Sequence, residues 1–337
     1  MNKKYWLFSL GFLFFLSCSK EIFNRFQGFR RPAGFPEPVY RFTDNPVTQA
    51  GFELGRKLFY EPRLSRDNTI SCGSCHIQSS AFTQHGHDVS HGIDDRLGTR
   101  NSPPIMNLAW MPTFFWDGGV FDLDLQPIVP ITNHVEMDET VGHVLTKLRT
   151  HPLYPSLYKN AFGDTAITTS RTMKALSQFM LLCVSAGSRY DSVVQQSGAR
   201  FTEPEQRGYI LFQQKCAACH KEPLFTDFSF RNNGIAAGLN DDKGRYLVTL
   251  DPADEYRFKV PSLRNVALTA PYMHDGRFIT LDAVLDHYRN QGQSTPNRDP
   301  LLASGIPLTD QDKSDLIAFL QTLSDRKFLA NPLLSER

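Results

Sequence analysis

The chain lacks an excess of charge of either sign. Its 337 residues include 36 lysines and arginines and 35 acidic residues, which gives a net charge of +1. Because binding to an acidic polymer generally relies on a strongly basic surface, this balance gives no indication of a nucleic-acid partner. The length is sufficient for two modest domains, and the apolar content of 41% is ordinary for a globular protein.

The N-terminus lacks an apolar run long enough to cross a bilayer comfortably. The run at residues 5–16 follows a basic start and is shorter than the roughly 20 residues of a spanning helix. It leads into "FLSC", which resembles a lipoprotein signal cleaved before Cys18; a plain secretory signal and an anchor helix are the alternatives. We predict a lipoprotein signal peptide at residues 1–18, a tether at residues 19–46 and a periplasmic protein attached to a membrane through lipid on Cys18.

Cysteine is also scarce, and four of the six cysteines form two pairs that each precede a histidine, in "CGSCH" and "CAACH". Cys-x-x-Cys-His is the attachment motif of c-type haem, in which the thiols bond to the vinyl groups and the imidazole becomes an axial iron ligand. A zinc site would use two neighbouring pairs or one pair with two spaced histidines, and a redox disulfide does not need the histidine. The sequence therefore predicts two covalently bound haem groups, held by Cys72, Cys75 and His76 and by Cys216, Cys219 and His220.

The segments around the two motifs repeat each other. Gly55 precedes the first motif as Gly208 precedes the second, and each glycine is followed by a Leu-Phe pair. After each motif comes Arg-Asn, and then an aromatic residue or histidine followed by Asp-Gly. We therefore predict an internal duplication, with one haem domain at residues 47–200 and another at residues 201–330.

Most of the chain has the periodicity of helices. Apolar residues share one face at residues 138–151 and 169–187, and Thr202 and Thr309 begin capping boxes with acids three residues later. Residues 226–260 lack helical periodicity and are predicted to form a long loop with short strands. The expected fold class is mainly α, with two cytochrome c-like domains.

Several longer motifs resemble the bacterial di-haem cytochrome c peroxidases, including the related MauG-like proteins. The resemblance covers residues 47–325 and depends on "GTRNSP", "FFWDGG", "DKGR" and "VPSLRNVALTAPYMHDGRF". It implies that the N-terminal haem reacts with hydrogen peroxide and that the C-terminal haem relays electrons from a small cytochrome or another redox protein. It also implies a calcium ion between the domains, and a homodimer is compatible with it.

The resemblance assigns roles to individual residues. Trp116 matches a tryptophan between the two haem groups, and Gln126 and Glu136 match the amide and carboxylate beside bound peroxide. A carboxylate in a dry pocket can move the proton that peroxide cleavage requires. From the residues alone, Glu136 could instead be an acid at a helix start and Trp116 a core residue. The calcium ligands implied are Asn101 and the backbone oxygens of Thr269 and Pro271.

Two iron ligands stay open in the sequence. His91 is the best placed of three loop histidines to be a distal ligand of the first haem; without it, that haem would be five-coordinate and open to peroxide. On the second haem, peroxidases place a methionine where this chain has Tyr288, as MauG-like proteins do, and Met273 is the rival ligand. A thioether favours reduced iron, whereas a phenolate-like oxygen favours higher oxidation states.

Three functions follow from these features. The first is a periplasmic peroxidase that reduces hydrogen peroxide to water with electrons from a cytochrome or similar donor. The second is a MauG-like enzyme that oxidises a protein or organic substrate through high-valent haem, which Tyr288 favours. The third is a di-haem electron carrier, which would need neither Gln126 nor Glu136. The overall resemblance favours the peroxidase.

Overall fold

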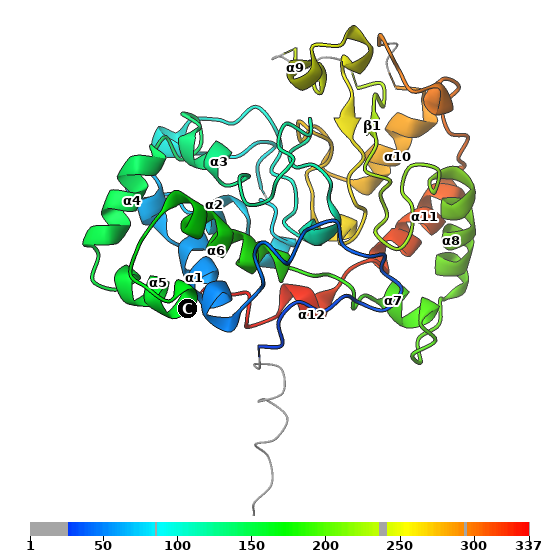
Figure 1. The fold of residues 1–337 in the computed structure, drawn as a ribbon. Helices are drawn as coiled ribbons and strands as arrows, with labels where there is room; N and C mark the ends of the chain where they lie inside the picture. The colour runs from blue at the N-terminus through cyan, green and yellow to red at the C-terminus, as the bar shows by residue number, and fades with distance from the viewer. Residues whose placement is uncertain (1–25, 85, 236–240, 293–294, 337) are drawn as a thin grey trace, which may run out of the picture.

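The computed structural model describes residues 26–84, 86–235, 241–292 and 295–336 (Figure 1). The predicted signal peptide, with Cys18, lies outside these residues. Within them, no helix combines the length and the apolar character that crossing a membrane requires.

Helices dominate the N-terminal half, which confirms the mainly α fold. Its α-helices are α1 (Gln49–Phe59), α2 (Cys72–Cys75), α3 (Ile128–Thr132), α4 (Val141–Thr150), α5 (Tyr154–Phe162) and α6 (Thr169–Leu181). Between them lie the 3-10 turns η2 (Pro62–Leu64), η3 (Gln78–Ser80), η4 (Ile93–Asp95) and η5 (Leu108–Trp110). The aromatic core of this half includes Phe52, Phe59, Phe82 and Phe179.

The C-terminal half lies beside the first and has its own core (Figure 1). Its α-helices are α7 (Arg189–Val194), α8 (Glu203–Lys215), α9 (Tyr246–Thr249), α10 (Leu281–Arg289) and α11 (Asp310–Gln321). The strands β1 (Phe230–Arg231) and β2 (Phe258–Lys259) pair antiparallel, and the 3-10 turns are η6 (Pro252–Asp254), η7 (Val266–Leu268) and η8 (Pro300–Leu302). The last helix, α12 (Arg326–Leu329), returns to the N-terminal half, where Phe328 joins its core.

The same helix pair occurs in both halves. α1 packs against α6 in the first half, and α8 packs against α11 in the second. A Cβ atom on Gly55 would lie 1.8 Å from the backbone oxygen of Ala175, and one on Gly208 would lie 1.9 Å from that of Asp315. Both pairs therefore depend on glycine at the crossing, which explains why the two glycines recur in the sequence repeat.

Downstream of the two haem motifs, the residues that correspond between the halves differ from those predicted. Asn107 and Asn265 both adopt the left-handed conformation and begin η5 and η7. A short backbone bridge follows in each half, Phe114 with Val120 and Tyr272 with Phe278. The predicted match of Arg100-Asn101 with Arg264-Asn265 is therefore wrong, because Asn107 is the counterpart of Asn265.

The predicted helices are present, with shorter ends. α4 and α6 fall inside the ranges 138–151 and 169–187, and the capping boxes at Thr202 and Thr309 are both formed. In the region predicted as a loop, the described residues contain only short elements, namely β1, α9, η6 and β2.

The described part of the predicted tether packs against the body. Phe35 is buried against Trp110, with ring centroids 5.0 Å apart, and the indole of Trp110 donates to the backbone oxygen of Pro36 at 2.8 Å. Asn45 is buried and donates to the backbone oxygen of Lys174 at 3.0 Å. Residues 26–46 are therefore part of the folded structure.

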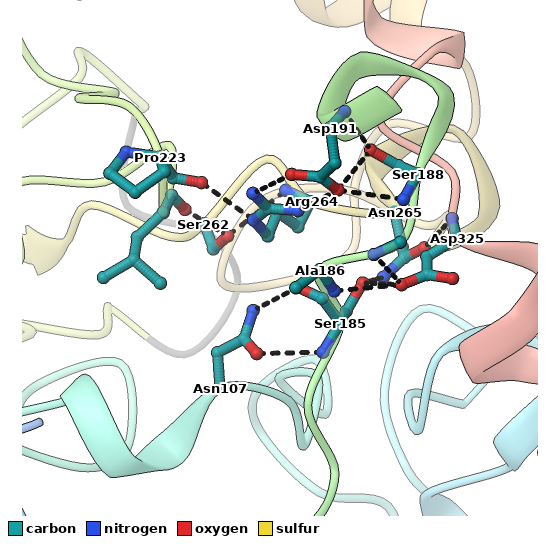
Figure 2. A network of polar contacts seen from close by, with 12 residues as sticks. Asn107, Ser185, Ala186, Ser188, Asp191, Pro223, Ser262, Arg264, Asn265 and Asp325 are labelled. Carbon is teal, nitrogen blue, oxygen red and sulfur yellow. Dashed lines mark hydrogen bonds and ion pairs between the residues drawn. The ribbon is translucent and has the colours of Figure 1, made fainter. Parts of the chain in front are cut away.

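A buried polar network joins the two halves around Ser185 (Figure 2). Asn107 donates to the backbone oxygen of Ser185 at 3.1 Å, and Asn265 donates to its hydroxyl at 3.0 Å. The same Asn265 accepts from the backbone of Asp325 at 2.7 Å. The two equivalent asparagines of the repeat thus hold one connecting segment, which fixes the halves relative to each other.

Breaking the ion pair in this network should be costly. Arg264 is fully buried and donates twice to Asp191, at 2.8 and 2.9 Å. Asp191→Ala would leave a buried guanidinium without its counter-charge, and we expect a loss of about 3–5 kcal/mol in the free energy of unfolding. Denaturant titration measures this loss. Asp164→Ala, which breaks the exposed pair with Arg171, is the control and should have a far smaller effect; equal effects would contradict the prediction.

Candidate functional site

Two cavities lie along the boundary between the halves. The first measures about 710 Å³ and the second about 220 Å³. A smaller cavity of about 60 Å³ reaches Cys72 and Cys75 and shares His76 with the first. The second cavity contains Cys216, Cys219 and His220. Each Cys-x-x-Cys-His motif therefore faces a largely apolar space that suits a flat apolar group, so the residues present fit haem c.

Both motif histidines are oriented by backbone oxygens. Nδ1 of His76 lies 2.8 Å from the backbone oxygen of Phe82, and Nδ1 of His220 lies 3.1 Å from that of Phe225. Burial lowers the pKa of both imidazoles, which favours the neutral form that can bind a metal. With Nδ1 donating to a carbonyl, Nε2 remains available as the ligand atom in each half.

Gln126 and Glu136 line the same cavity as His76. Burial raises the pKa of Glu136, although a hydrogen bond from Asn133 at 2.7 Å partly opposes this shift. Helix α4 begins at Val141 and has no acidic residue in its first turn. Glu136 is therefore not a helix-start acid but a half-buried carboxyl group on the cavity wall, suited to holding and moving a proton.

The backbone of Glu136 is held by a close contact with Gly92. A Cβ atom on Gly92 would lie 2.2 Å from the backbone oxygen of Val135 and 2.5 Å from that of Glu136. The backbone oxygen of Glu136 also accepts from the amide of Ile93 at 2.7 Å. The position of the Glu136 carboxyl group thus depends on the absence of a side chain at residue 92.

We expect Gly92→Ala to displace Glu136, to lose about 1–3 kcal/mol in stability and to lower the turnover of peroxide that is proposed below. Steady-state kinetics and thermal unfolding measure the two effects. Gly142→Ala is the matched control, because nothing lies within 4 Å of its added Cβ atom in α4; it should raise stability slightly and leave turnover unchanged. Unchanged turnover in Gly92→Ala would contradict the contact's role.

His91 does not line either cavity. Its Nδ1 lies 2.6 Å from a carboxylate oxygen of Asp95, its ring packs on His87, and its side chain is 35% exposed. The third loop histidine, His85, lies outside the described residues. The geometry is therefore against His91 as a distal ligand and favours the five-coordinate alternative for the first haem.

The second cavity receives both rival ligands. Leu281, Val284, Leu285 and Tyr288 all line it, so the predicted shared face of α10 is confirmed. Burial raises the pKa of Tyr288, and Asn233 opposes this shift through a hydrogen bond. Met273 also lines the cavity, but its sulfur accepts a hydrogen bond from Asn233 at 3.4 Å.

Trp116 lines both cavities, as expected of a residue between two redox groups. Its indole donates to the backbone oxygen of Asn101 at 2.8 Å. Its own backbone oxygen accepts from the amide of Lys259 at 2.7 Å. One residue from each half of the molecule therefore holds the indole-bearing segment in place.

Arg100 connects three of the motifs quoted from the sequence. It donates to Asp242 of "DKGR" at 2.6 and 2.8 Å and to Asp117 of "FFWDGG" at 2.5 Å, and it belongs itself to "GTRNSP". This cluster and Lys259 were missed by sequence reasoning. The cluster could have been predicted from the sequence, because each of the three motifs contains a charged residue and the charge of Arg100 is complementary to those of Asp117 and Asp242.

Asn101 fits the role of a cation ligand. Its Oδ1 is buried without a hydrogen-bond partner, and its Nδ2 faces the backbone oxygen of Pro271 at 2.5 Å. Thr269 and Pro271 lie with Asn101 along the lining of the second cavity. An oxygen-binding cation would satisfy the orphaned oxygen. Among the described residues no group of three or more His, Cys, Asp or Glu could hold a metal ion.

Comparison with known proteins gives similarities that span both halves. The family model described as di-haem cytochrome c peroxidase matches residues 49–199, and that for cytochrome c matches residues 205–324. The chain is 36% identical to the methylamine utilization protein MauG of Methylorubrum extorquens over 88% of this chain and 83% of that protein. It is 34% identical to the cytochrome c551 peroxidase of Nitrosomonas europaea over 86% and 83%, respectively. A solved structure of a MauG-like protein associated with microbial copper homeostasis has a TM-score of 0.84 at 34% identity, over 92% of this chain and 99% of that one.

Proposed function

Because the chain belongs to the family of di-haem cytochrome c peroxidases and MauG proteins, we propose that it reduces hydrogen peroxide to water with electrons from a small cytochrome or similar donor. The observation that carries the proposal is the first cavity, where Gln126 and the half-buried Glu136, whose pKa is raised, share the space that His76 faces. A simple electron carrier would need no acid in such a place.

Haem c bound through Cys72, Cys75 and His76 would supply the iron at which peroxide is bound and reduced. The carboxylate of Glu136 would hold the proton lost by one peroxide oxygen and deliver it to the other as the O–O bond breaks, which releases that oxygen as water. Two electrons from the donor and two protons from solvent would convert the remaining oxygen to the second water. The amide of Gln126 offers a donor and an acceptor that orient the peroxide. Trp116 provides an aromatic path from the second cavity, where the donor's electrons enter.

A stoichiometric reaction tests this proposal. Protein reduced by two electrons, one on each haem, should consume one equivalent of hydrogen peroxide and return to the oxidised spectrum. The prediction fails if the peroxide remains while both haem groups are present and reduced. Rapid-mixing absorbance spectroscopy and a peroxide assay together supply both readings.

A second candidate is the MauG-like oxidation of a protein or organic substrate. Tyr288 favours it, because it lines the second cavity from the same face of α10 as Leu281, Val284 and Leu285. Asn233 hydrogen-bonds both Tyr288 and the sulfur of Met273, so that contact does not distinguish the two rival ligands. An oxygen ligand favours higher oxidation states of iron, which suits an enzyme that withdraws electrons from a substrate. The ligand experiment argued in the Discussion separates the two candidates.

We also propose that calcium binds at Asn101 with the backbone oxygens of Thr269 and Pro271. Because these residues come from the two halves, removal of the ion should loosen the boundary near Trp116. We expect a chelator to lower turnover and calcium to restore it, and Asn101→Ala to make turnover insensitive to both. Chelator-resistant turnover in protein shown to be free of calcium would contradict this.

The site of action follows the same family. We propose a periplasmic location, since the N-terminal signal pattern directs export, with attachment to a membrane through Cys18. A homodimer is compatible with this proposal. Mass spectrometry of the mature N-terminus would show whether residue 18 is the first residue and carries lipid.

A further inference from the structure

The first cavity is poor in cations. Among the described residues that line it, only Arg100 and Lys259 carry a full positive charge, whereas Asp117, Glu136, Asp241 and Asp242 are acidic. Arg100 is fully engaged, because it donates to both Asp242 and Asp117. Lys259 is therefore the remaining cation that can meet a negative group in this space.

Lys259 comes from β2 of the C-terminal half but reaches across the boundary. Its Nζ donates to the backbone oxygen of Thr113 at 2.8 Å, and the side chain lines both cavities. In the part of the chain that the structure describes, no carboxylate lies within ion-pair distance of this ammonium. The nearby Asp117 attracts it electrostatically but pairs with Arg100.

The positive charge of Lys259 lacks a counter-ion in this position. Burial lowers the pKa of Lys259 to about 8, which shows that the charged form is poorly solvated there. Enclosed charges in proteins are normally paired, because an uncompensated one costs several kcal/mol. One carbonyl oxygen accepts one of the three ammonium hydrogens. Since no carboxylate of the described residues pairs with the ammonium, its charge lacks an anionic partner.

The haem expected in the first cavity brings such a partner. Its two cysteine attachments lie in the small cavity that Cys72 and Cys75 line, whereas Lys259 lines the adjoining larger cavity, which shares His76 but neither cysteine. Haem carries two carboxylates on the edge away from its thioether bonds. We propose that Lys259 is the counter-ion of a carboxylate of the first haem, supplied across the boundary by the opposite half of the molecule.

This arrangement would also position Trp116. The backbone amide of Lys259 donates to the oxygen of Trp116, and its ammonium donates to the oxygen of Thr113 in the same segment. One residue thus holds the segment from residue 113 to residue 116 at both ends. A haem carboxylate on the same ammonium would couple the first haem to the residue that lines both cavities.

The proposal rests on haem binding in the first cavity but not on peroxide turnover, so its test uses the resting holoenzyme without peroxide. In Lys259→Gln the reduced haem loses a nearby positive charge, and its reduction potential should shift downward. Lys259→Arg should stay near the wild-type potential because it keeps the charge. Lys159→Gln removes an exposed charge from α5 and should shift neither haem. Spectroelectrochemical titration resolves the two haem groups.

An unshifted first haem in Lys259→Gln would overturn the proposal, as would an equal shift in Lys159→Gln. If Lys259→Gln does not fold, the wild-type holoenzyme still decides the matter. In its crystal structure, Nζ of Lys259 should lie about 2.7–2.9 Å from a carboxylate oxygen of the first haem. An ammonium bonded only to Thr113, with both haem carboxylates elsewhere, would contradict the assignment.

Discussion

Glu136→Gln should lower peroxide turnover by about 10²–10⁴-fold and leave both haem spectra unchanged. Glutamine keeps the size and polarity of the side chain and can still accept from Asn133, but it cannot take up and return a proton. Because burial raises the pKa of Glu136, the carboxyl group stays protonated to a higher pH than an ordinary glutamate. Wild-type turnover should therefore fall as the pH drops through this raised value, and the variant should lose that limb of the pH profile.

A neighbouring carboxylate provides the matched control. Glu139 pairs with Lys147 and does not line the cavities, and its pKa lies below the ordinary value because of its hydrogen bonds to Lys147, Thr140 and His143, which outweigh its burial. Glu139→Gln should retain most of the turnover and the low-pH limb. Near-normal turnover in Glu136→Gln, or an equal loss in both variants, would remove the acid–base role proposed for Glu136.

Tyr288→Phe should open a coordination position on the haem held by His220 and change its spin state. The phenol lines the second cavity from the apolar face of α10, and a phenyl ring offers no ligand atom in its place. Tyr288→Met should instead keep the haem six-coordinate and raise its reduction potential, since a thioether stabilises reduced iron better than an anionic oxygen. Absorbance and magnetic circular dichroism spectra report the spin state, and spectroelectrochemical titration measures the reduction potential.

Met273→Leu is the complementary variant. If Tyr288 is the ligand, this change removes only the sulfur that accepts from Asn233, and the spectrum of the second haem should stay as it is. The opposite pattern, with Tyr288→Phe silent and Met273→Leu altered, would make Met273 the ligand. That result would favour an ordinary peroxidase with a high-potential haem over the MauG-like alternative.

Sequence reasoning succeeded where chemistry is tied to spacing. The Cys-x-x-Cys-His motifs each face a cavity, and the periodicity of α10 placed Tyr288 on the lining face. Gly55 and Gly208 recur because the backbone of a neighbouring helix lies so close to each that a side chain would clash with it. Such features depend on local geometry, which a single sequence expresses directly.

The predicted register of the repeat was wrong because the same dipeptide occurs at positions with different backbone conformations, and other site features depend on contacts that a sequence does not display. The dipeptide Arg-Asn recurs at Asn101, but the left-handed turn that defines the repeat recurs at Asn107. His91 stays a prediction as a ligand: its spacing is suitable, but in this structure its side chain contacts Asp95, which spacing cannot show. Lys259 gave no signal, because its importance lies in a long side chain reaching across to Thr113 in the other half.

The central claim is that peroxide is reduced at the haem of the first cavity, with electrons that arrive through the haem of the second cavity. Its most direct test is steady-state oxidation of a reduced small c-type cytochrome by hydrogen peroxide, using protein shown by intact mass to carry two haem groups. We expect saturable turnover with two donor molecules oxidised per peroxide. Donor oxidation no faster than the reaction without enzyme, with both haem groups in place, would contradict the claim and leave substrate oxidation of the MauG-like kind as the function to pursue.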